Sequence, residues 1–272
     1  MPIDHDPLYV RARRVLLDAL DSLGPHRNSV VLVGAQALYL RVGAGALPVA
    51  PFTTDGDLAI DPLNLADEPL LVEALTSSGF VLAVRPGSWM RDSVSVDFMV
   101  PATLCNSGRR GARLGVHGSD MARRTVGIEA TLVDHDLLPL GSLDASDGRT
   151  HMVAVAGLAA LLVAKLHKLV DGESNPTRAL SKDGLDVLRI LQECDIVEIA
   201  GKLEWLERHP IAGDTVSRAH DSLRRLFGRK GGHGVELTVR ATTGIESPEV
   251  ISESCIQLAN QLLDQWVRAR SA

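Results

Sequence analysis

The fold is decided by two stretches of the chain, VVLVGAQ at residues 30–36 and TTDGDLAI at residues 53–60. The first is a β-branched run that stops at Gly34 and passes into helix formers, so it predicts a strand followed directly by a helix. The second places Asp55 and Asp57 at i and i+2, which in a strand point to the same side. Two such carboxylates are tolerated beside each other when a divalent cation lies between them. Because a helix N-terminus also favours phosphate, this order predicts a site for a nucleoside triphosphate with Mg²⁺ or Mn²⁺.

Length and composition set the class of protein. A chain of 272 residues suits one large or two small domains, and with 45% apolar but only 3% aromatic residues its core must consist of Leu, Val, Ile and Ala. No apolar run has membrane-spanning length, and the N-terminus lacks the order of a signal peptide. The three cysteines, Cys105, Cys194 and Cys255, are too far apart for a metal site or a disulfide framework. These features predict a cytoplasmic protein with reduced thiols and no membrane partner.

Hydrophobic periodicity divides the chain near residue 150. Before that point, helical and strand patterns alternate; after it, every periodic segment has the helical period. The pattern predicts helices at 7–23, 35–42, 67–77, 156–166, 182–192, 196–206, 215–227 and 248–268, and strands at 30–33, 58–60, 80–84, 93–100 and 151–155, with a glycine-rich break at 231–234. We therefore expect an α/β domain over residues 1–150, with a mixed sheet flanked by helices, and an all-α domain over residues 151–272.

A third carboxylate, Asp97, lies inside the expected strand at 93–100. An acidic residue in a β-rich run has two readings: it is exposed on an edge strand, or it joins Asp55 and Asp57 in a common site. The second reading is favoured because two carboxylates already lie upstream. Asp97 is then a general base for an incoming hydroxyl or a metal ligand.

The arrangement of Gly34-Ala35 after a strand, followed by Asp55-Gly56-Asp57 on the next, resembles the signature of the nucleotidyltransferase superfamily. Members usually have Gly-Ser or Gly-Gly at the first position and a β-branched residue between the carboxylates. The resemblance implies a nucleotidyltransferase-like fold. It implies that the metal is held by Asp55, Asp57 and Asp97. It implies that the backbone N–H groups of Gly34 and Ala35 contact the phosphates. The hydroxyls of Thr53 and Thr54, just before the carboxylate pair, are further candidates for phosphate contact.

Lys165 interrupts an otherwise apolar helix, and a lysine is almost never buried unless it is paired. The alternatives are a snorkelling lysine or a cation that neutralises a triphosphate. The string VAKLHKL at 163–169, followed by KDGLDV at 182–187, resembles the AbiEii family, the nucleotidyltransferase toxins of type IV toxin–antitoxin systems and their mycobacterial relatives. That resemblance places Lys165 and Asp183 in the active site. Lys165 would bind the triphosphate, and we expect Asp183 to be its partner when no nucleotide is bound.

Basic residues are clustered although the net charge is −6. The cluster consists of Arg109, Arg110, Arg113, Arg123 and Arg124. It follows the strand of Asp97 in a glycine-rich context that also contains His117, which suits contact with nucleic-acid phosphates. An ordinary solvated loop is the equally weighted alternative.

Together these features predict an enzyme that moves a nucleoside monophosphate from an NTP to an acceptor hydroxyl. The AbiEii resemblance implies a tRNA 3′ end as the acceptor, growth arrest as the outcome and a cognate antitoxin as a partner. One alternative is a small-molecule nucleotidyltransferase similar to those that modify aminoglycosides. Another is a degenerate nucleotide- or partner-binding module without turnover, which is motivated by Ala35 and Gly56.

Overall fold

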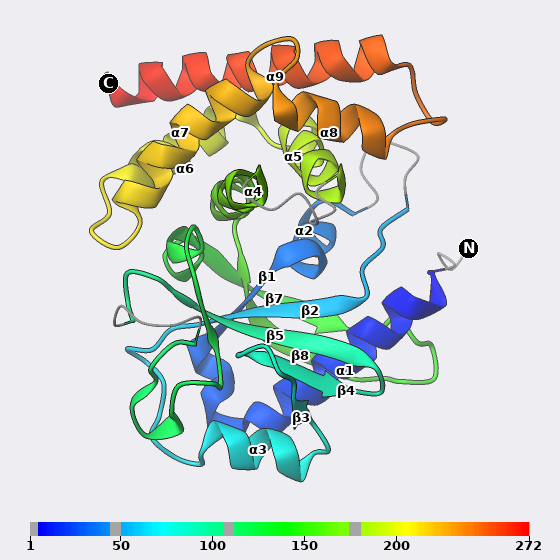
Figure 1. Ribbon diagram of the computed structural model, residues 1–272, viewed down its shortest axis with the longest axis vertical. Coiled ribbons are helices and arrows are strands. Elements are labelled where there is room, and N and C mark those ends of the chain that lie inside the picture. Colours follow the sequence, from blue (N-terminus) through cyan, green and yellow to red (C-terminus); the bar gives the residue numbers. More distant parts are fainter. Residues whose placement is uncertain (1–4, 44–49, 106–110, 174–180, 272) are drawn as a thin grey trace. The chain divides into compact units, whose positions relative to one another are not determined.

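A computed structural model describes residues 5–43, 50–105, 111–173 and 181–271 of the chain. It divides into two compact units (Figure 1). The first unit consists of Met1–Leu40 with Pro51–Ala156, and the second of Arg41–Ala50 with Gly157–Ala272. The first is mixed α/β and the second is helical, as the periodicity predicts.

The first unit is built on an eight-stranded mixed sheet. Its strands are β1 (Val30–Val33), β2 (Asp55–Ile60), β3 (Val81–Leu82), β4 (Ser88–Arg91), β5 (Val94–Pro101), β6 (Arg123–Thr125), β7 (His135–Gly141) and β8 (Thr150–Ala156). The order is β3-β4-β5-β2-β1-β8-β7, and β6 pairs with β5 beyond the end of β4. β2 is antiparallel to β1 and parallel to β5. The Asp-x-Asp strand therefore lies in the middle of the sheet, next to the strand of Asp97.

One face of this sheet lines the hydrophobic core of the unit. Leu32, Leu58 and Phe98 are register partners on β1, β2 and β5, and all three are almost completely buried. The helices α1 (Pro7–Leu23) and α3 (Leu71–Ser77) lie together on one side of the sheet (Figure 1). A Cβ atom at Gly56 would lie 3.1 Å from Cδ1 of Leu16 on α1. The glycine between the two carboxylates is therefore explained by the close approach of α1 to the apolar face.

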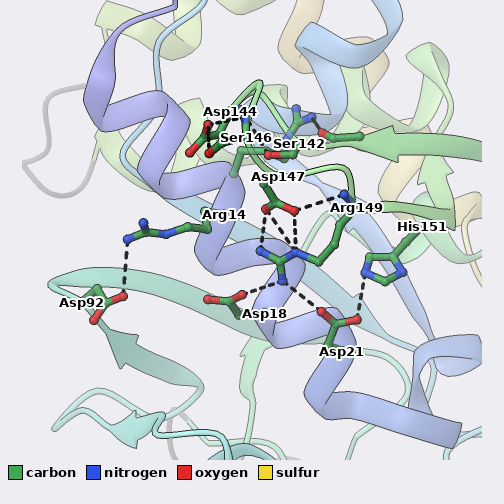
Figure 2. Close-up of polar contacts among 12 residues, drawn as sticks. Arg14, Asp18, Asp21, Asp92, Ser142, Asp144, Ser146, Asp147, Arg149 and His151 are labelled. Carbon is green, nitrogen blue, oxygen red and sulfur yellow. Dashed lines mark hydrogen bonds and ion pairs between the residues drawn. The ribbon is translucent and has the colours of Figure 1, made fainter.

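A network of ion pairs links α1 to the hairpin of β7 and β8 (Figure 2). Arg149 donates to both carboxylate oxygens of Asp147 and reaches Asp18 at 2.7 Å and Asp21 at 3.0 Å on α1. Hydrogen bonds from the Arg149 side chain and backbone lower the pKa of Asp147 to about 2. The network therefore holds the β7–β8 hairpin, at one edge of the sheet, against α1.

The second unit is a bundle of α4 (Leu158–Glu173), α5 (Ser181–Glu193), α6 (Ile196–Glu207), α7 (Gly213–Phe227), α8 (His233–Ala241) and α9 (Pro248–Arg270). The long helix α9 runs along α6, α7 and α8 (Figure 1). α5 packs closely on α8, because a Cβ atom at Gly184 would lie 2.9 Å from Oγ1 of Thr238 and 3.1 Å from Cβ of Leu237. Apolar side chains of all six helices fill the interior.

The sequence-based boundaries are correct for most elements and wrong for several. The helix expected at 67–77 begins only at Leu71, because Pro69 disfavours the helical conformation of the residue before it. Strand β4 was not predicted, nor was the 3₁₀ turn Glu129–Leu132. Gly231 and Gly232 of the expected break at 231–234 do separate α7 from α8, but α8 already begins at His233. The boundary was expected near residue 150, and the first compact unit extends to Ala156 because it includes β8, which pairs with β1.

Candidate active site

The carboxylates predicted from the sequence lie on one face of the sheet. Val33 of β1 is the register partner of Asp57, and Asp57 is the partner of Asp97 on the parallel strand β5. Asp55 lies two residues before Asp57 on the same strand, so it shares that face. This face is opposite to the face of Leu58, which packs on α1. The sheet therefore presents Asp55, Asp57 and Asp97 to one side.

The helix α2 (Gly34–Val42) begins directly beside Asp57. Gly34 has a φ of +70° and a Cβ atom there would lie 2.1 Å from Oδ2 of Asp57, so the carboxylate occupies the space that a side chain at 34 would need. Only glycine combines this backbone conformation with this close approach. A carboxylate at a helix N-terminus is favoured by the helix dipole, and the same N-terminus attracts phosphate. The carboxylate of Asp57 thus lies beside the N-terminus of α2.

Asp55 is held from two sides. The buried amide of Gln36 donates from Nε2 to the Asp55 carbonyl at 2.8 Å, and its Oε1 accepts from Nε of the buried Arg13 at 2.7 Å. The hydroxyl of Thr53 donates to Oδ1 of Asp55 at 2.6 Å. Thr53 is buried and engaged with the carboxylate, whereas Thr54 is exposed. Of the two threonines expected to contact phosphate, Thr54 is the one with a solvent-facing side chain.

Asp97 has cationic partners that the sequence did not predict. Its Oδ2 accepts from the guanidinium groups of Arg85 and Arg123, each at 2.5 Å, and its Oδ1 accepts from the hydroxyl of Ser88 at 2.8 Å. Both arginines come from the side of β5 away from β2. The carboxylate is therefore engaged on the side of β5 away from Asp57, although Asp57 and Asp97 are register partners.

Asp55 and Asp57 fit the chemistry of a magnesium site. Mg²⁺ is usually bound through one or two carboxylates together with substrate phosphates and water. Within the described ranges, no group of three or more His, Cys, Asp or Glu side chains is arranged to hold a metal ion. A two-carboxylate site completed by phosphate oxygens agrees with both observations, while Asp97 as a third ligand remains a prediction.

In the second unit, Lys165 is buried in a cluster of charges. Its Nζ donates to Oδ1 of Asp183 and to Oδ2 of Asp186, both at 2.7 Å. The partner predicted from the sequence, Asp183, is confirmed. Lys168, half exposed, donates to the same oxygen of Asp183 at 3.0 Å, and buried Arg189 donates to Asp186 at 3.3 Å. Three cations and two anions thus join α4 to α5.

The electrostatics of this cluster favour the charged forms. Burial alone would lower the pKa of Lys165, but the carboxylates of Asp186 and Asp183 outweigh it and raise that pKa above the ordinary lysine value. Burial would raise the pKa of Asp183, but Lys165 and Lys168 lower it to about 2. Lys165 and Asp183 are therefore both charged at neutral pH.

The structure describes three of the five arginines that are expected to contact nucleic acid. Arg109 and Arg110 lie outside the described residues. Arg113 and Arg124 are exposed, whereas Arg123 is bound to Asp97. His117, which lies in the same segment, is buried and structural: Nδ1 accepts from the Leu71 N–H and Nε2 donates to the Ala66 carbonyl. Its expected contribution to a nucleic-acid surface is therefore wrong.

Comparison of the chain with protein-family models, with curated proteins and with solved structures finds no match. None of the helices within the described ranges is long and apolar enough to cross a membrane.

Several residues of the candidate site were missed by sequence reasoning. They are Gln36, Arg85, Ser88, Asp186 and Arg189. Asp186 and Arg189 carried a usable signal, because charged residues on the apolar face of a helix need partners. Arg85 and Ser88 carried none, because they lie in a turn and a strand whose contact with Asp97 follows from the long-range pairing of β4 with β5.

Proposed function

We propose that the protein is a metal-dependent nucleotidyltransferase that moves a nucleoside monophosphate from an NTP to an acceptor hydroxyl and releases pyrophosphate. The observation that carries the proposal is the position of Asp57. It shares a face with Asp55 on its own strand and is the register partner of Asp97 on the neighbouring strand, with its carboxylate against Gly34 at the start of α2. A divalent cation held by Asp55 and Asp57 would supply positive charge next to a phosphate bound at this helix start.

The roles of the residues follow from that placement. Asp55 and Asp57 would hold Mg²⁺ or Mn²⁺, which when bound neutralises charge on the phosphates. The first turn of α2, with the N–H groups of Gly34 and Ala35, would bind a phosphate oxygen. Asp97 would orient the acceptor hydroxyl and accept its proton, which requires the carboxylate to be released from part of its present hydrogen bonding.

The assignment of Lys165 and Asp183 to the active site rests on the resemblance to AbiEii proteins. Support from this chain is that Lys165 is charged and rigidly held by Asp183 and Asp186. A test must separate catalysis from stability. Lys165→Arg keeps the charge, so a variant that folds and loses NTP-dependent transfer would support a role for the ammonium group itself.

The resemblance extends the proposal to a tRNA 3′ end as the acceptor, a growth-arresting toxin as the biological role and an antitoxin as the partner. The deciding experiment incubates the full chain with each of the four labelled NTPs, Mg²⁺ or Mn²⁺, and total tRNA. Labelling of tRNA by the wild-type chain, and its loss in the Asp57→Asn variant, would support the proposal. Labelling of an aminoglycoside in place of tRNA would support the small-molecule alternative.

A nucleotide-binding module without turnover is the second candidate. It is favoured by one observation, the engagement of Asp97 by two arginines and Ser88, which occupies the group that would activate the acceptor. NTP binding without transfer to tRNA, to aminoglycosides or to the protein itself would decide for this candidate.

A further inference from the structure

Three hydrogen-bond donors converge on one carboxylate beside the acidic pair. They come from Arg85 in the turn between β3 and β4, from Ser88 on β4 and from Arg123 on β6. Asp97 and Ser88 are buried, while the side chains of Arg85 and Arg123 are 53% and 22% exposed. Charged donors that converge in this way can bind the oxygens of either a carboxylate or a phosphate.

Backbone packing holds the two arginines together. Gly87, which follows Arg85 closely in the turn, has a φ of +76°, and a Cβ atom there would lie 2.4 Å from the Phe98 carbonyl oxygen and 2.5 Å from the backbone N of Arg123. The Gly87 carbonyl also accepts from the Phe98 N–H at 2.7 Å. The turn therefore packs closely on β5 and β6, and this packing keeps the guanidinium groups of Arg85 and Arg123 near each other.

The summed formal charge of the three carboxylates and two arginines would change sign if a divalent cation bound. Asp55, Asp57 and Asp97 carry −3 and Arg85 and Arg123 carry +2, which sums to −1. A divalent cation on Asp55 and Asp57 would change that sum to +1. A phosphate group would then restore the balance, and the exposed part of Arg85 offers donors that Asp97 does not use, since a guanidinium has five N–H groups.

We propose that Arg85, Arg123 and Ser88 form an anion subsite for a phosphate group, and that the carboxylate of Asp97 competes with that phosphate for the same donors. The inference rests on the proposed function only for the source of the phosphate, which is either the triphosphate of the NTP or the backbone of the acceptor nucleic acid. Arg85 and Arg123 are binding residues in this arrangement, and they also position Asp97.

The test titrates inorganic tripolyphosphate into the full chain by calorimetry, without and with Mg²⁺. Replacing Arg85 or Arg123 by Gln removes a charged hydrogen-bond donor and should weaken binding roughly tenfold or more. Asp97→Asn should strengthen binding in the absence of Mg²⁺, because the competing charge is gone. The control is Arg14→Gln, which removes an arginine whose exposure is close to that of Arg85 and which pairs with Asp92 instead.

Two outcomes would overturn the subsite. One is unchanged tripolyphosphate affinity in both arginine variants, and the other is weaker binding by Asp97→Asn. Where a Gln variant fails to fold, Arg85→Lys and Arg123→Lys keep the charge but lose the planar fork, and they should retain only part of the affinity. If the folded lysine variants bind tripolyphosphate as tightly as the wild type and the Arg14→Gln control do, that result would also count against the subsite.

The source of the phosphate is decided by two further measurements. A raised KM for the NTP with unchanged tRNA affinity assigns the subsite to the triphosphate. A weaker tRNA complex, whose slope of log affinity against log salt falls by about 0.7 to 0.9 because one arginine no longer binds a phosphate, assigns it to the acceptor. Tripolyphosphate binding through Arg85 and Arg123 without any NTP-dependent transfer would leave the subsite standing and reject the proposed transferase activity.

Discussion

A Cβ atom on residue 34 would lie 2.1 Å from Oδ2 of Asp57 and 2.9 Å from its Cβ, so Gly34 and Asp57 share one volume at the start of α2. The pair joins the two stretches of sequence that define the candidate site. It also explains why the first strand ends in a glycine. The glycine gives the backbone its left-handed turn and leaves room for the carboxylate at the helix N-terminus.

Gly34→Ala should therefore destabilise the first unit. The left-handed conformation alone costs about 1–2 kcal/mol for a residue with a Cβ, and the contact with Asp57 adds to it. We expect a lower urea midpoint of the first unit, followed by fluorescence of Trp89 in a background where Trp205 and Trp266 are replaced by Phe. Gly79→Ala is the control, since Gly79 has a φ of +82° but no neighbour within 4 Å of a Cβ. Equal losses in the two variants would show that Asp57 does not crowd residue 34.

Asp57→Asn should abolish NTP-dependent transfer and leave the fold intact. The loss should exceed about a hundredfold, because even outer partners of metal ligands are worth about 10- to 100-fold. The melting temperature should change little, since removing one of two neighbouring carboxylates relieves their repulsion. Asp92→Asn, which alters a surface carboxylate paired with Arg14, should keep full activity. Transfer by Asp57→Asn at the wild-type rate would reject the metal site.

Lys165→Ala should destabilise the helical unit strongly. It leaves Asp183 and Asp186 buried without their common cation, and breaking a buried pair in this way costs about 3–5 kcal/mol. The free energy of unfolding can be followed by Trp205 and Trp266 in a Trp89→Phe background. Lys168→Ala is the control: its ammonium is half exposed, so it should cost less than about 1 kcal/mol. Similar small losses in both variants would mean that Lys165 is not the centre of the cluster.

The second unit should lose stability in acid through Asp183. Its folded-state pKa is lowered to about 2, below the value near 3.9 of an unfolded aspartate. A carboxyl group whose pKa is lowered by folding contributes its full share to the free energy of unfolding at pH values above its unfolded pKa. That contribution is lost as the pH falls from about 4 towards 2. Asp183→Asn should flatten the pH dependence of the urea midpoint in this window. An unchanged slope in that variant would contradict the ion pair.

The exposed arginines of the cluster, Arg113 and Arg124, are expected to contact nucleic-acid phosphates together with Arg109 and Arg110. Replacing Arg109, Arg110 and Arg113 by Ala should weaken tRNA binding and lower its salt slope by about 0.7 to 0.9 for each arginine that binds a phosphate in the wild type. NTP binding should not change. Unchanged tRNA affinity and slope would identify the segment as an ordinary solvated loop.

The local sequence pattern alone determined several elements and residue placements of this protein. The strand, glycine and helix at residues 30–42 and the shared side of Asp55 and Asp57 follow from periods of two and 3.6 residues, which depend only on neighbours in the chain. The need of Lys165 for a partner follows from the cost of burying an unpaired charge. These features could be predicted because their physical causes act within a few residues.

Tertiary structure decided which groups face each other. The pattern put Asp97 inside a strand, but only the pairing of β5 with β2, β4 and β6 brought it beside Asp57 and into contact with Arg85 and Arg123. The arginines, separated from Asp97 by 12 and 26 residues, carry no periodic signal that marks them as its partners. Coulomb energy depends on distance in space and on burial, both of which are set by strand order and by the packing of turns such as that of Gly87.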